Sequence, residues 1–424
     1  EIASCLVGSE MCIRDSFCTE EELDKVRAKQ EEDKVLTGYY GEYATCRNLS
    51  YEEIEANIKA GKPYVLRLRS QGSPDKEITF VDAIKGEIKL PENIHDIVLL
   101  KKDGIPTYHF AHAIDDHLMR TTTVVRGGEW LASAPIHYEL FHLLGFKMPA
   151  YAHTAHLMKF DEETGGKRKL SKRKDPELSL DYYRKDGYHP YTMKVYLLTL
   201  LNSNFEEWHE KFPDKDINEF PFSVEKMNQS GALFDKDKLH NICKNELSKL
   251  SEEELYDFLY DWAKENEPEN VEKWFGDREK MLQILRLYMG VGAKRRRKDL
   301  MYAKQIFELI SYFFDGESAE EMDKFKLDDD MVSKILKSYL AKYDHNDDNS
   351  VWFNKLKEIA DEHGFASDMK AYKANPENFK GNVSDIAEAV RIAVTGRANT
   401  PDLWTIVHIM GEEQMTERIK KHIK

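Results

Sequence analysis

The sequence contains little cysteine and no long hydrophobic run. Its five cysteines include no Cys-x-x-Cys pair, and five in 424 residues do not make the disulfide framework of a small secreted domain. The longest apolar runs, such as Val195 to Leu201, are too short to span a bilayer. The start of the chain also lacks the apolar stretch of a signal peptide. We therefore expect a cytoplasmic protein with no membrane partner.

The chain also lacks an excess of positive charge. Its formal net charge of −15 argues against general electrostatic binding of nucleic acid. With 41% hydrophobic and 33% charged residues, the composition is that of a globular protein of several domains. Basic residues cluster locally, at 167–174 and 294–298. Either cluster could bind a polyanion, and a solvated surface is the other interpretation; for the second cluster both stay open.

Residues 5–16 show neither helical nor strand periodicity. They read CLVGSEMCIRDS and resemble an in-frame translation of a transposase sequencing adapter. An ordinary N-terminal coil is the alternative interpretation. The adapter interpretation predicts that residues 1–16 are not native and that the biological sequence begins near Phe17.

Secondary-structure signals differ between the N-terminal and the C-terminal parts of the chain. Thr19 precedes three glutamates and is the expected N-cap of a helix. Short β-rich segments follow, at 64–69, 78–81 and 97–100. A helix, a buried β-branched strand and a second helix are expected next, at 108–119, 121–126 and 132–144. This alternation predicts part of a parallel α/β layer.

The chain after about residue 180 is expected to be almost entirely helical. Ser251 and Glu254 have the spacing of a capping box, and an apolar stripe over 386–394 ends at Gly396, the expected C-cap. Such stripes indicate helix packing and carry no functional signal of their own.

Residues 165–173 contain the most informative motif, Gly-Gly-Lys-Arg-Lys-Leu-Ser-Lys-Arg. Lys169 and Lys172 are three residues apart, so a helical or tightly turned segment would place both ammonium groups on one side. Two such charges can hold a triphosphate and stabilise the charge that develops on it. Alone, this string is a weak signal, because a solvated basic loop explains it in most proteins.

Further motifs surround this loop in a fixed order. They are Gly104 to Ala111, Asp115 to Met119, Val125 to Trp130, Asp181 to Tyr183, Gly187-Tyr188, Ser230 to Asp235, Ala393 to Arg397 and Thr400-Pro401. Taken together, the chain from about Phe17 to Lys424 resembles the bacterial glutamyl-tRNA synthetases, a family of class I aminoacyl-tRNA synthetases. The resemblance implies a multidomain fold, α/β followed by all-α: a partial Rossmann-type catalytic domain with an acceptor-binding insertion, then a helical anticodon-binding region.

The resemblance also implies domain boundaries. The expected parts are a partial acceptor-binding insertion at 17–104, the second half of the catalytic domain at 105–164, a signature-loop and stem-contact region at 165–250, and the anticodon-binding region at 251–424.

The resemblance assigns the ATP site to the loop at residues 165–173, which corresponds to the signature loop of class I synthetases. Lys169 and Lys172 match the catalytic lysines that bind the ATP phosphates and stabilise the transition state at the α-phosphate. The ATP-binding residues would be Trp130, Lys169, Leu170, Ser171, Lys172 and Arg173. Without the family match, Trp130 would be interpreted as a core residue.

The glutamate site is implied to contain Tyr108, His112 and Arg126. A planar guanidinium suits a bidentate hold on a carboxylate, although a structural ion pair is the alternative role for Arg126. The family usually has asparagine where this chain has His112, and the charge of an imidazole depends on pH. Without the family match, Tyr108 and His112, which are four residues apart on one helical face, would be interpreted as packing residues.

Metal binding is expected only through ATP, which the family uses with Mg²⁺. Some family members bind zinc through a Cys-x-Cys and a Cys-x-His, and Cys18 and Cys46 stand near those places. The partner positions hold Ser16 and Asn48, and two thiolates do not complete a tetrahedral site. We predict no zinc.

No His-x-Gly-His string occurs in the sequence, although class I synthetases use such a motif to contact ATP. We therefore expect a truncated copy of an enzyme that does not form glutamyl-adenylate by itself. We also expect an exposed sheet edge to make residues 105–165 poorly stable or prone to aggregate.

The expected function is ATP-dependent activation of glutamate and its transfer to the 3′ end of tRNA-Glu. The sequence leaves open whether tRNA-Gln is also a substrate, and family likeness suggests a monomer. A glutaminyl-tRNA synthetase ranks lower, because its anticodon region is typically a β-barrel. A glutamyl-queuosine synthetase would have no anticodon region. A non-catalytic tRNA-binding protein is the remaining alternative, which the missing motif favours and the 169–173 loop opposes.

Overall fold

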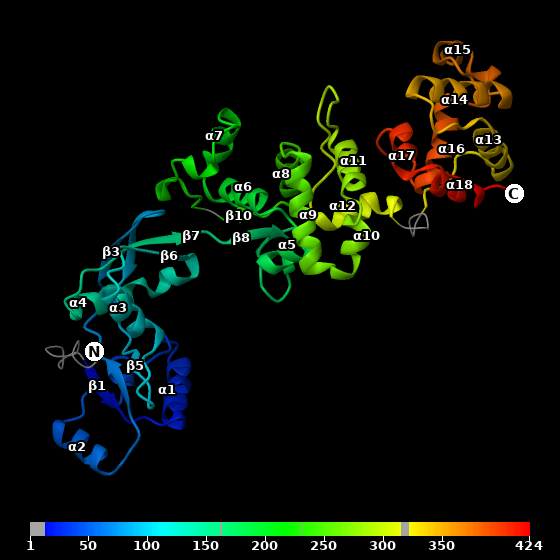
Figure 1. The fold of residues 1–424 in the computed structure, drawn as a ribbon. Helices are drawn as coiled ribbons and strands as arrows, with labels where there is room; N and C mark the ends of the chain where they lie inside the picture. The colour runs from blue at the N-terminus through cyan, green and yellow to red at the C-terminus, as the bar shows by residue number, and fades with distance from the viewer. Residues whose placement is uncertain (1–12, 162, 230, 315–321) are drawn as a thin grey trace. The chain divides into compact units, whose positions relative to one another are not determined.

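The computed structural model describes residues 13–161, 163–229, 231–314 and 322–424 (Figure 1). The chain forms two compact units. Unit 1 comprises Glu1–Leu170 and Leu198–Phe234, and unit 2 comprises Ser171–Leu197 and Asp235–Lys424. Residues 1–12, which belong to the segment predicted to be non-native, lie outside the described residues. Within the described part of the chain, no helix combines the length and apolar character needed to cross a membrane.

The strands of unit 1 form three small sheets in its described residues. They are β1 Ile13–Ser16, β2 Val65–Leu68, β3 Glu77–Asp82, β4 Gly86–Pro91, β5 Val98–Leu100, β6 Thr123–Gly127, β7 Ala150–Thr154, β8 Leu157–Phe160, β9 Lys167–Lys169 and β10 Ala232–Leu233. The strand orders are β1-β2-β5, β4-β3-β7-β6 and β10-β8-β9. β1 pairs with β2 in antiparallel fashion. This strand was not expected, because its residues show no alternation of apolar and polar side chains.

Unit 1 contains five α-helices in its described residues, besides part of α6. They are α1 Glu20–Glu32, α2 Tyr51–Lys59, α3 Tyr108–Leu118, α4 Ala134–Leu143 and α7 Phe205–Lys211. The predicted cap at Thr19 is confirmed, since its hydroxyl accepts from the amide of Glu22 and the Glu22 carboxylate accepts from the amide of Thr19. α6 Pro190–Leu201 runs from unit 2 into unit 1.

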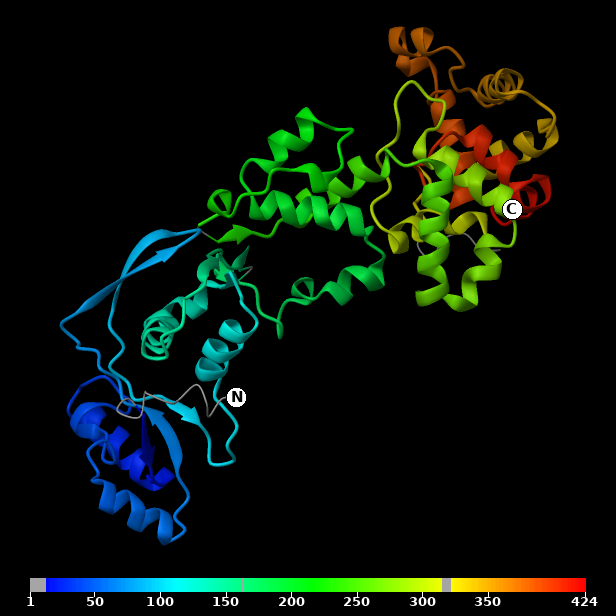
Figure 2. The same cartoon turned by 60° about the vertical axis from the view of Figure 1, so that its left-hand side comes forward.

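The predicted helix–strand–helix segment is present as α3, β6 and α4. β6 pairs in parallel with β7, and β7 with β3, which confirms the parallel layer. α3 and α4 lie side by side and share a core with Leu68 and Leu99 (Figure 2). The expectation of a buried strand at 121–126 was wrong, because β6 is the last strand of its sheet and Val125 is 59% exposed.

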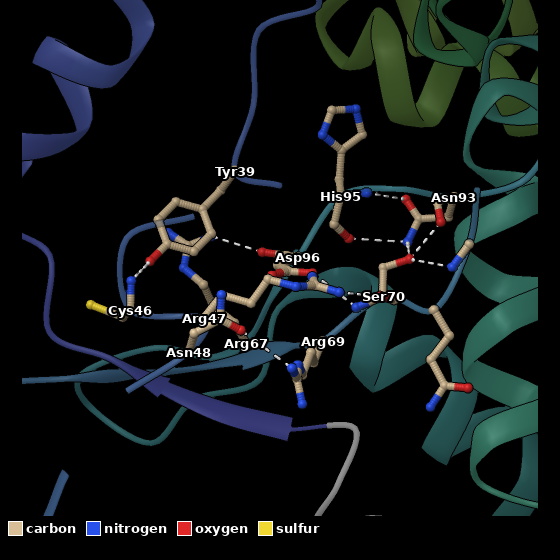
Figure 3. A network of polar contacts seen from close by, with 12 residues as sticks. Tyr39, Cys46, Arg47, Asn48, Arg67, Arg69, Ser70, Asn93, His95 and Asp96 are labelled. Carbon is tan, nitrogen blue, oxygen red and sulfur yellow. Dashed lines mark hydrogen bonds and ion pairs between the residues drawn. The ribbon is translucent and has the colours of Figure 1, made fainter. Parts of the chain in front are cut away.

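A polar network joins the first sheet to α4 (Figure 3). Asp96 forms an ion pair with Arg47 and accepts from the amide of Ser70. The hydroxyl of Ser70 donates to the Glu139 carboxylate at 2.9 Å, and the Asn93 amide donates to it at 2.7 Å. These charge-assisted bonds satisfy side chains that are largely buried, as their burial requires.

Unit 2 is helical, as predicted. Its helices are α5 Leu180–Asp186, α8 Lys236–Leu247, α9 Glu252–Asn266, α10 Val271–Phe275, α11 Arg278–Met289, α12 Ala303–Ile310, α13 Asp329–Lys342, α14 Asn349–His363, α15 Met369–Ala374, α16 Val383–Thr395, α17 Leu403–Met410 and α18 Glu412–Lys420. One continuous apolar core contains residues of every helix from α9 to α18 except α15. The capping box of Ser251 and Glu254 is confirmed, and Gly396 ends α16 with a φ of 74°.

Candidate active site

Arg126 is the second-last residue of β6, at the carboxyl end of a parallel strand. Parallel sheets place ligand sites at this edge, outside the strand ends. The register sets Arg126 opposite His153 on β7. Its Nε donates to His153 Nε2 at 2.9 Å, its Nη1 lies 3.1 Å from His137 Nδ1, and its Nη2 donates to the carbonyl of Trp130 at 3.4 Å. The guanidinium carbon also lies 4.8 Å from the centre of the Tyr151 ring.

Tyr108 and Trp130 are brought together beside Arg126. Tyr108 is the first residue of α3 and remains 48% exposed. Trp130 lies in a 3-10 helix, Gly128–Ser133, that directly follows β6. The two ring centres are 4.5 Å apart with a tilt of 36°. The paired rings of Tyr108 and Trp130 therefore lie near Arg126, which donates to the Trp130 carbonyl.

His112 lies one turn after Tyr108, with its ring nitrogens bound inside the protein. Nε2 is 2.7 Å from the hydroxyl of Tyr151, and Nδ1 is 2.9 Å from the Asp116 carboxylate. Burial lowers the pKa of His112, with Asp116 opposing that shift and Arg126 adding to it. A direct hydrogen bond from His112 to a ligand therefore requires that one of these two contacts be exchanged.

The signature loop crosses the boundary between the units, which falls between Leu170 and Ser171. Lys169 is the last residue of the strand β9, so Lys169 and Lys172 do not lie on one helix. Leu170 is buried, and its amide donates to the carbonyl of Leu157. Beyond the boundary, the Ser171 amide donates to the buried Asp175 carboxylate at 2.8 Å, and the turn leaves Lys172 and Arg173 exposed.

Glu129, one residue before Trp130, faces two basic groups. Its carboxylate lies 3.6 Å from the ammonium of Lys169 and 3.5 Å from His156 Nδ1. A hydrogen bond to its own backbone amide, together with the charge of Lys169, lowers the pKa of Glu129. Lys169 is 51% exposed, so this ion pair is weak enough for a phosphate to replace.

Cys18 and Cys46 lie together, with 3.3 Å between their sulfur atoms. The hydrogen bond from Cys46 lowers the pKa of Cys18 to about 5. Cys18 also contacts the hydroxyl groups of Tyr39 and Thr45. Among the described residues, no group of three or more His, Cys, Asp or Glu side chains is arranged to hold a metal ion.

Unit 2 has a cleft of 740 Å³ between α11, α17 and the loop that joins α11 to α12. The loop extends away from the helix ends in both views (Figures 1 and 2). Arg295 and Arg297 of the loop line the cleft together with Trp404 and His408, whose rings are 4.2 Å apart. The second basic cluster of the sequence therefore lies beside an aromatic surface.

Several residues of the site were not found by sequence reasoning. They are Asp82, His109, Glu129, His137, Tyr151 and His153. His153 could have been identified from the pairing of β6 with β7, because that register sets it opposite Arg126. No local pattern marks His137 on α4.

Comparison with known proteins assigns the class. Residues 8–241 match the family described as tRNA synthetases class I (E and Q), catalytic domain, and residues 268–423 match the anticodon binding domain family. The fold matches a crystal structure of a glutamate tRNA ligase from Elizabethkingia meningosepticum in complex with its amino acid, with a TM-score of 0.73, 24% identity, and 99% of this chain and 80% of that chain covered. The chain therefore has the catalytic domain of a class I aminoacyl-tRNA synthetase and an anticodon-binding domain.

Curated relatives narrow the class. The glutamate–tRNA ligase of Acetivibrio thermocellus is 52% identical over 407 residues, which are 96% of this chain and 74% of that protein. The glutamate–tRNA ligase of Sorangium cellulosum is 37% identical, with the same coverage. The chain belongs to the glutamate–tRNA ligase family, and it spans about three quarters of the length of these relatives.

Proposed function

We propose that this chain acts in the ATP-dependent ligation of glutamate to tRNA-Glu. The observation that carries the proposal is the grouping of Arg126, Tyr108 and Trp130 at the carboxyl end of β6 in a chain of this family. Glutamate activation requires a cation for a carboxylate and a group that stabilises charge on the ATP phosphates. Arg126 supplies the first, and the lysines of the signature loop supply the second.

Within the glutamate site, Arg126 is proposed to bind a carboxylate of the amino acid through two parallel N–H···O bonds. Tyr108, a half-exposed residue, is proposed to offer its hydroxyl to the same ligand. His112 completes the proposed site, and its contacts with Tyr151 on β7 and with Asp116 on its own helix fix its position. Binding at these groups fixes the nucleophilic carboxylate for attack on the α-phosphate.

For ATP, Lys169 and Lys172 are proposed to hold the phosphates as pyrophosphate leaves. Trp130 is proposed to lie against the nucleotide, and the loop backbone at Leu170, Ser171 and Arg173 to shape the phosphate site. Replacement of the Lys169–Glu129 ion pair by a phosphate would free the lysine where charge develops. Magnesium is proposed to arrive bound to the ATP phosphates, because the described side chains provide no cluster for it.

In unit 2, the helical region from about residue 251 is proposed to bind the anticodon of the tRNA. Basic side chains beside aromatic rings suit unstacked bases and the phosphates between them. Residues 17–104 are proposed to hold the acceptor end, 105–164 to form the catalytic layer and 165–250 to contact the stem. We also propose that the protein is a cytoplasmic monomer that binds no zinc, which metal analysis of the purified chain would test.

The test is charging of total tRNA with labelled glutamate. It compares this chain with the same chain extended by the first catalytic half of a family member. Charging that is lost in Lys169→Ala, Lys172→Ala and Arg126→Ala, with Lys174→Ala as the control in the same loop, supports the proposal. Absence of charging by every form, with tRNA binding intact, would instead support a tRNA-binding protein without catalysis.

A further inference from the structure

Arg126 is held by two histidines from different elements. His153 lies on β7 and His137 on α4, and both side chains are fully buried. The bonds from Arg126 to His153, to His137 and to the carbonyl of Trp130 involve all three guanidinium nitrogens. Because a guanidinium has five N–H donors, two remain for a ligand. The contacts that fix the group leave enough donors for a bidentate partner.

The tautomer of His153 follows from its neighbours. Arg126 can only donate, so His153 Nε2 must accept and carries no proton. The proton of the ring is then on Nδ1, which lies 2.6 Å from the Asp82 carboxylate. Asp82 also accepts from the backbone amides of Ile84, Lys85 and His153. Burial opposes ionisation of Asp82, but these bonds together lower its pKa, so the carboxylate stays an acceptor.

The tautomer of His137 is opposite. Its Nδ1 faces Arg126 Nη1 at 3.1 Å and must accept, so the proton is on Nε2. Nε2 lies 3.0 Å from His109 Nδ1, which accepts it in turn. The single fixed donor, Arg126, therefore sets the protonation of three imidazoles.

Both histidines are neutral in this arrangement. His137 faces Arg126, His109, His112, Tyr108 and Tyr151. Its burial, followed by the charges of His112 and Arg126, lowers its pKa to about 2. Burial also lowers the pKa of His153, although its bond to Asp82 favours the charged form and Arg126 opposes it. A proton added to either ring would remove an acceptor and set a second cation against the guanidinium.

We propose that His153 and His137 are positioning residues for Arg126, accepting its hydrogen bonds as neutral rings of opposite tautomer, with Asp82 fixing the tautomer of His153. The role of Arg126 toward the glutamate carboxylate rests on the proposed function. The positioning itself rests only on the bonds within unit 1. Lysine could not replace Arg126 here, because a single ammonium cannot bind both rings and a carboxylate in one plane.

The first test reads the tautomers directly. The full chain is labelled with ¹⁵N-histidine, and its ring nitrogens are observed by NMR between pH 5.5 and 8. The signals of the two rings are assigned from the spectra of His153→Gln and His137→Asn. We expect a neutral His153 with its proton on Nδ1 and a neutral His137 with its proton on Nε2 at pH 6. A charged ring, or the other tautomer at either residue, would overturn the proposal.

The second test measures the affinity of the purified chain and its variants for L-glutamate. Loss of the acceptor in His137→Leu is expected to weaken binding about 10-fold, the usual cost of a bond to a charged group. His137→Asn keeps an acceptor near the Nδ1 position and is expected to restore most of the affinity. His142→Leu, an exposed histidine on the same helix, is the control.

The two tests separate the two ideas. Equal loss in His137→Leu and His137→Asn would indicate a packing role and overturn the positioning proposal. Absence of glutamate binding by the unaltered chain would count against the proposed function of the site. In that case the NMR tautomers alone would decide whether the histidines position Arg126.

Discussion

At the scale of single residues, the site is built from side chains whose protonation is decided by their neighbours. Arg126 offers hydrogen-bond donors and no acceptor, so it determines which nitrogen of His137 and of His153 can bear a proton. Burial reinforces that choice by disfavouring the charged ring. Charged imidazoles next to an arginine would repel it. Because these imidazoles are neutral, the cluster is compatible with a folded core.

This neutrality predicts a contribution of His137 to the pH dependence of stability. An unfolded histidine binds a proton as the pH falls below about 6.5, whereas folded His137 does not until about pH 2. The unfolded state therefore binds more protons in this window, so stability falls as the pH falls. At pH 5 the loss from this one group is about 2 kcal/mol.

The measurement is urea unfolding of the native chain and of His137→Asn at pH 7 and pH 5. The variant starts less stable at pH 7 and is expected to lose less free energy of unfolding between the two pH values. His142→Asn serves as an exposed control. An identical pH dependence for the native chain and His137→Asn would show that the folded ring titrates normally.

At the scale of elements, β6 is both the carrier of Arg126 and the edge of its sheet. In the described residues it pairs with β7 on one side only. Val125 points away from the face that holds Val124 and Arg126, and is 59% exposed. An exposed apolar edge strand offers unpaired backbone groups to another chain.

We therefore predict that Val125→Lys reduces aggregation while the chain stays folded, because a charge on an edge strand disfavours edge-to-edge pairing. The measurement is light scattering on incubation at 37 °C, with circular dichroism to confirm folding. Leu36→Lys adds the same charge at an exposed position outside any strand. Equal improvement in both variants would attribute the effect to net charge.

The capping box that begins α9 gives a second prediction at this scale. Ser251 accepts from the amide of Glu254, and the Glu254 carboxylate accepts from the amide of Ser251. Ser251→Ala is expected to lower the free energy of unfolding of unit 2 by about 1 kcal/mol. Ser350→Ala, in the first turn of α14, should have a much smaller effect in the same denaturant titration, since Asp348 caps that helix.

At the scale of the whole molecule, charge is distributed unevenly. A net charge of −15 repels a polyanion, so tRNA binding must depend on local basic surfaces. The loop between α11 and α12 is one of these, and Lys298 and Arg297 are engaged with Asn245 and Asp299. Lys294, Arg295 and Arg296 are exposed in the same loop.

Replacing Lys294, Arg295 and Arg296 by serine is predicted to weaken tRNA binding and to lower its dependence on salt. Each phosphate contact contributes about 0.7 to 0.9 to the slope of log affinity against log salt, so the slope should fall by about two.

Filter binding or fluorescence anisotropy at several salt concentrations measures this slope. The control replaces three exposed lysines outside the loop, Lys370, Lys373 and Lys420. An unchanged slope in the loop variant would show that the loop is only a solvated surface.

The sequence predicted local structure well where neighbours in the chain decide it. Caps at Thr19 and Ser251 and the end of α16 at Gly396 depend on contacts within a few residues. The order of motifs around Lys169 to Arg173 was enough to indicate the family, which the comparisons confirm. The burial of β6 was mispredicted, because β-branched residues indicate a strand but not its place in a sheet.

The sequence by itself therefore determined the family, the helical character of the chain after about residue 180, the helix ends at Thr19, Ser251 and Gly396, and the candidate residues carried by motifs. Only the tertiary structure decided what surrounds Arg126. His137 and His153 lie 11 and 27 residues from it in the chain and contact it through the packing of α4 and the sheet register. Asp82, which lies 44 residues from it, contacts His153. Register and helix packing are set by contacts between distant segments, and those contacts leave no periodic pattern in the chain around each residue.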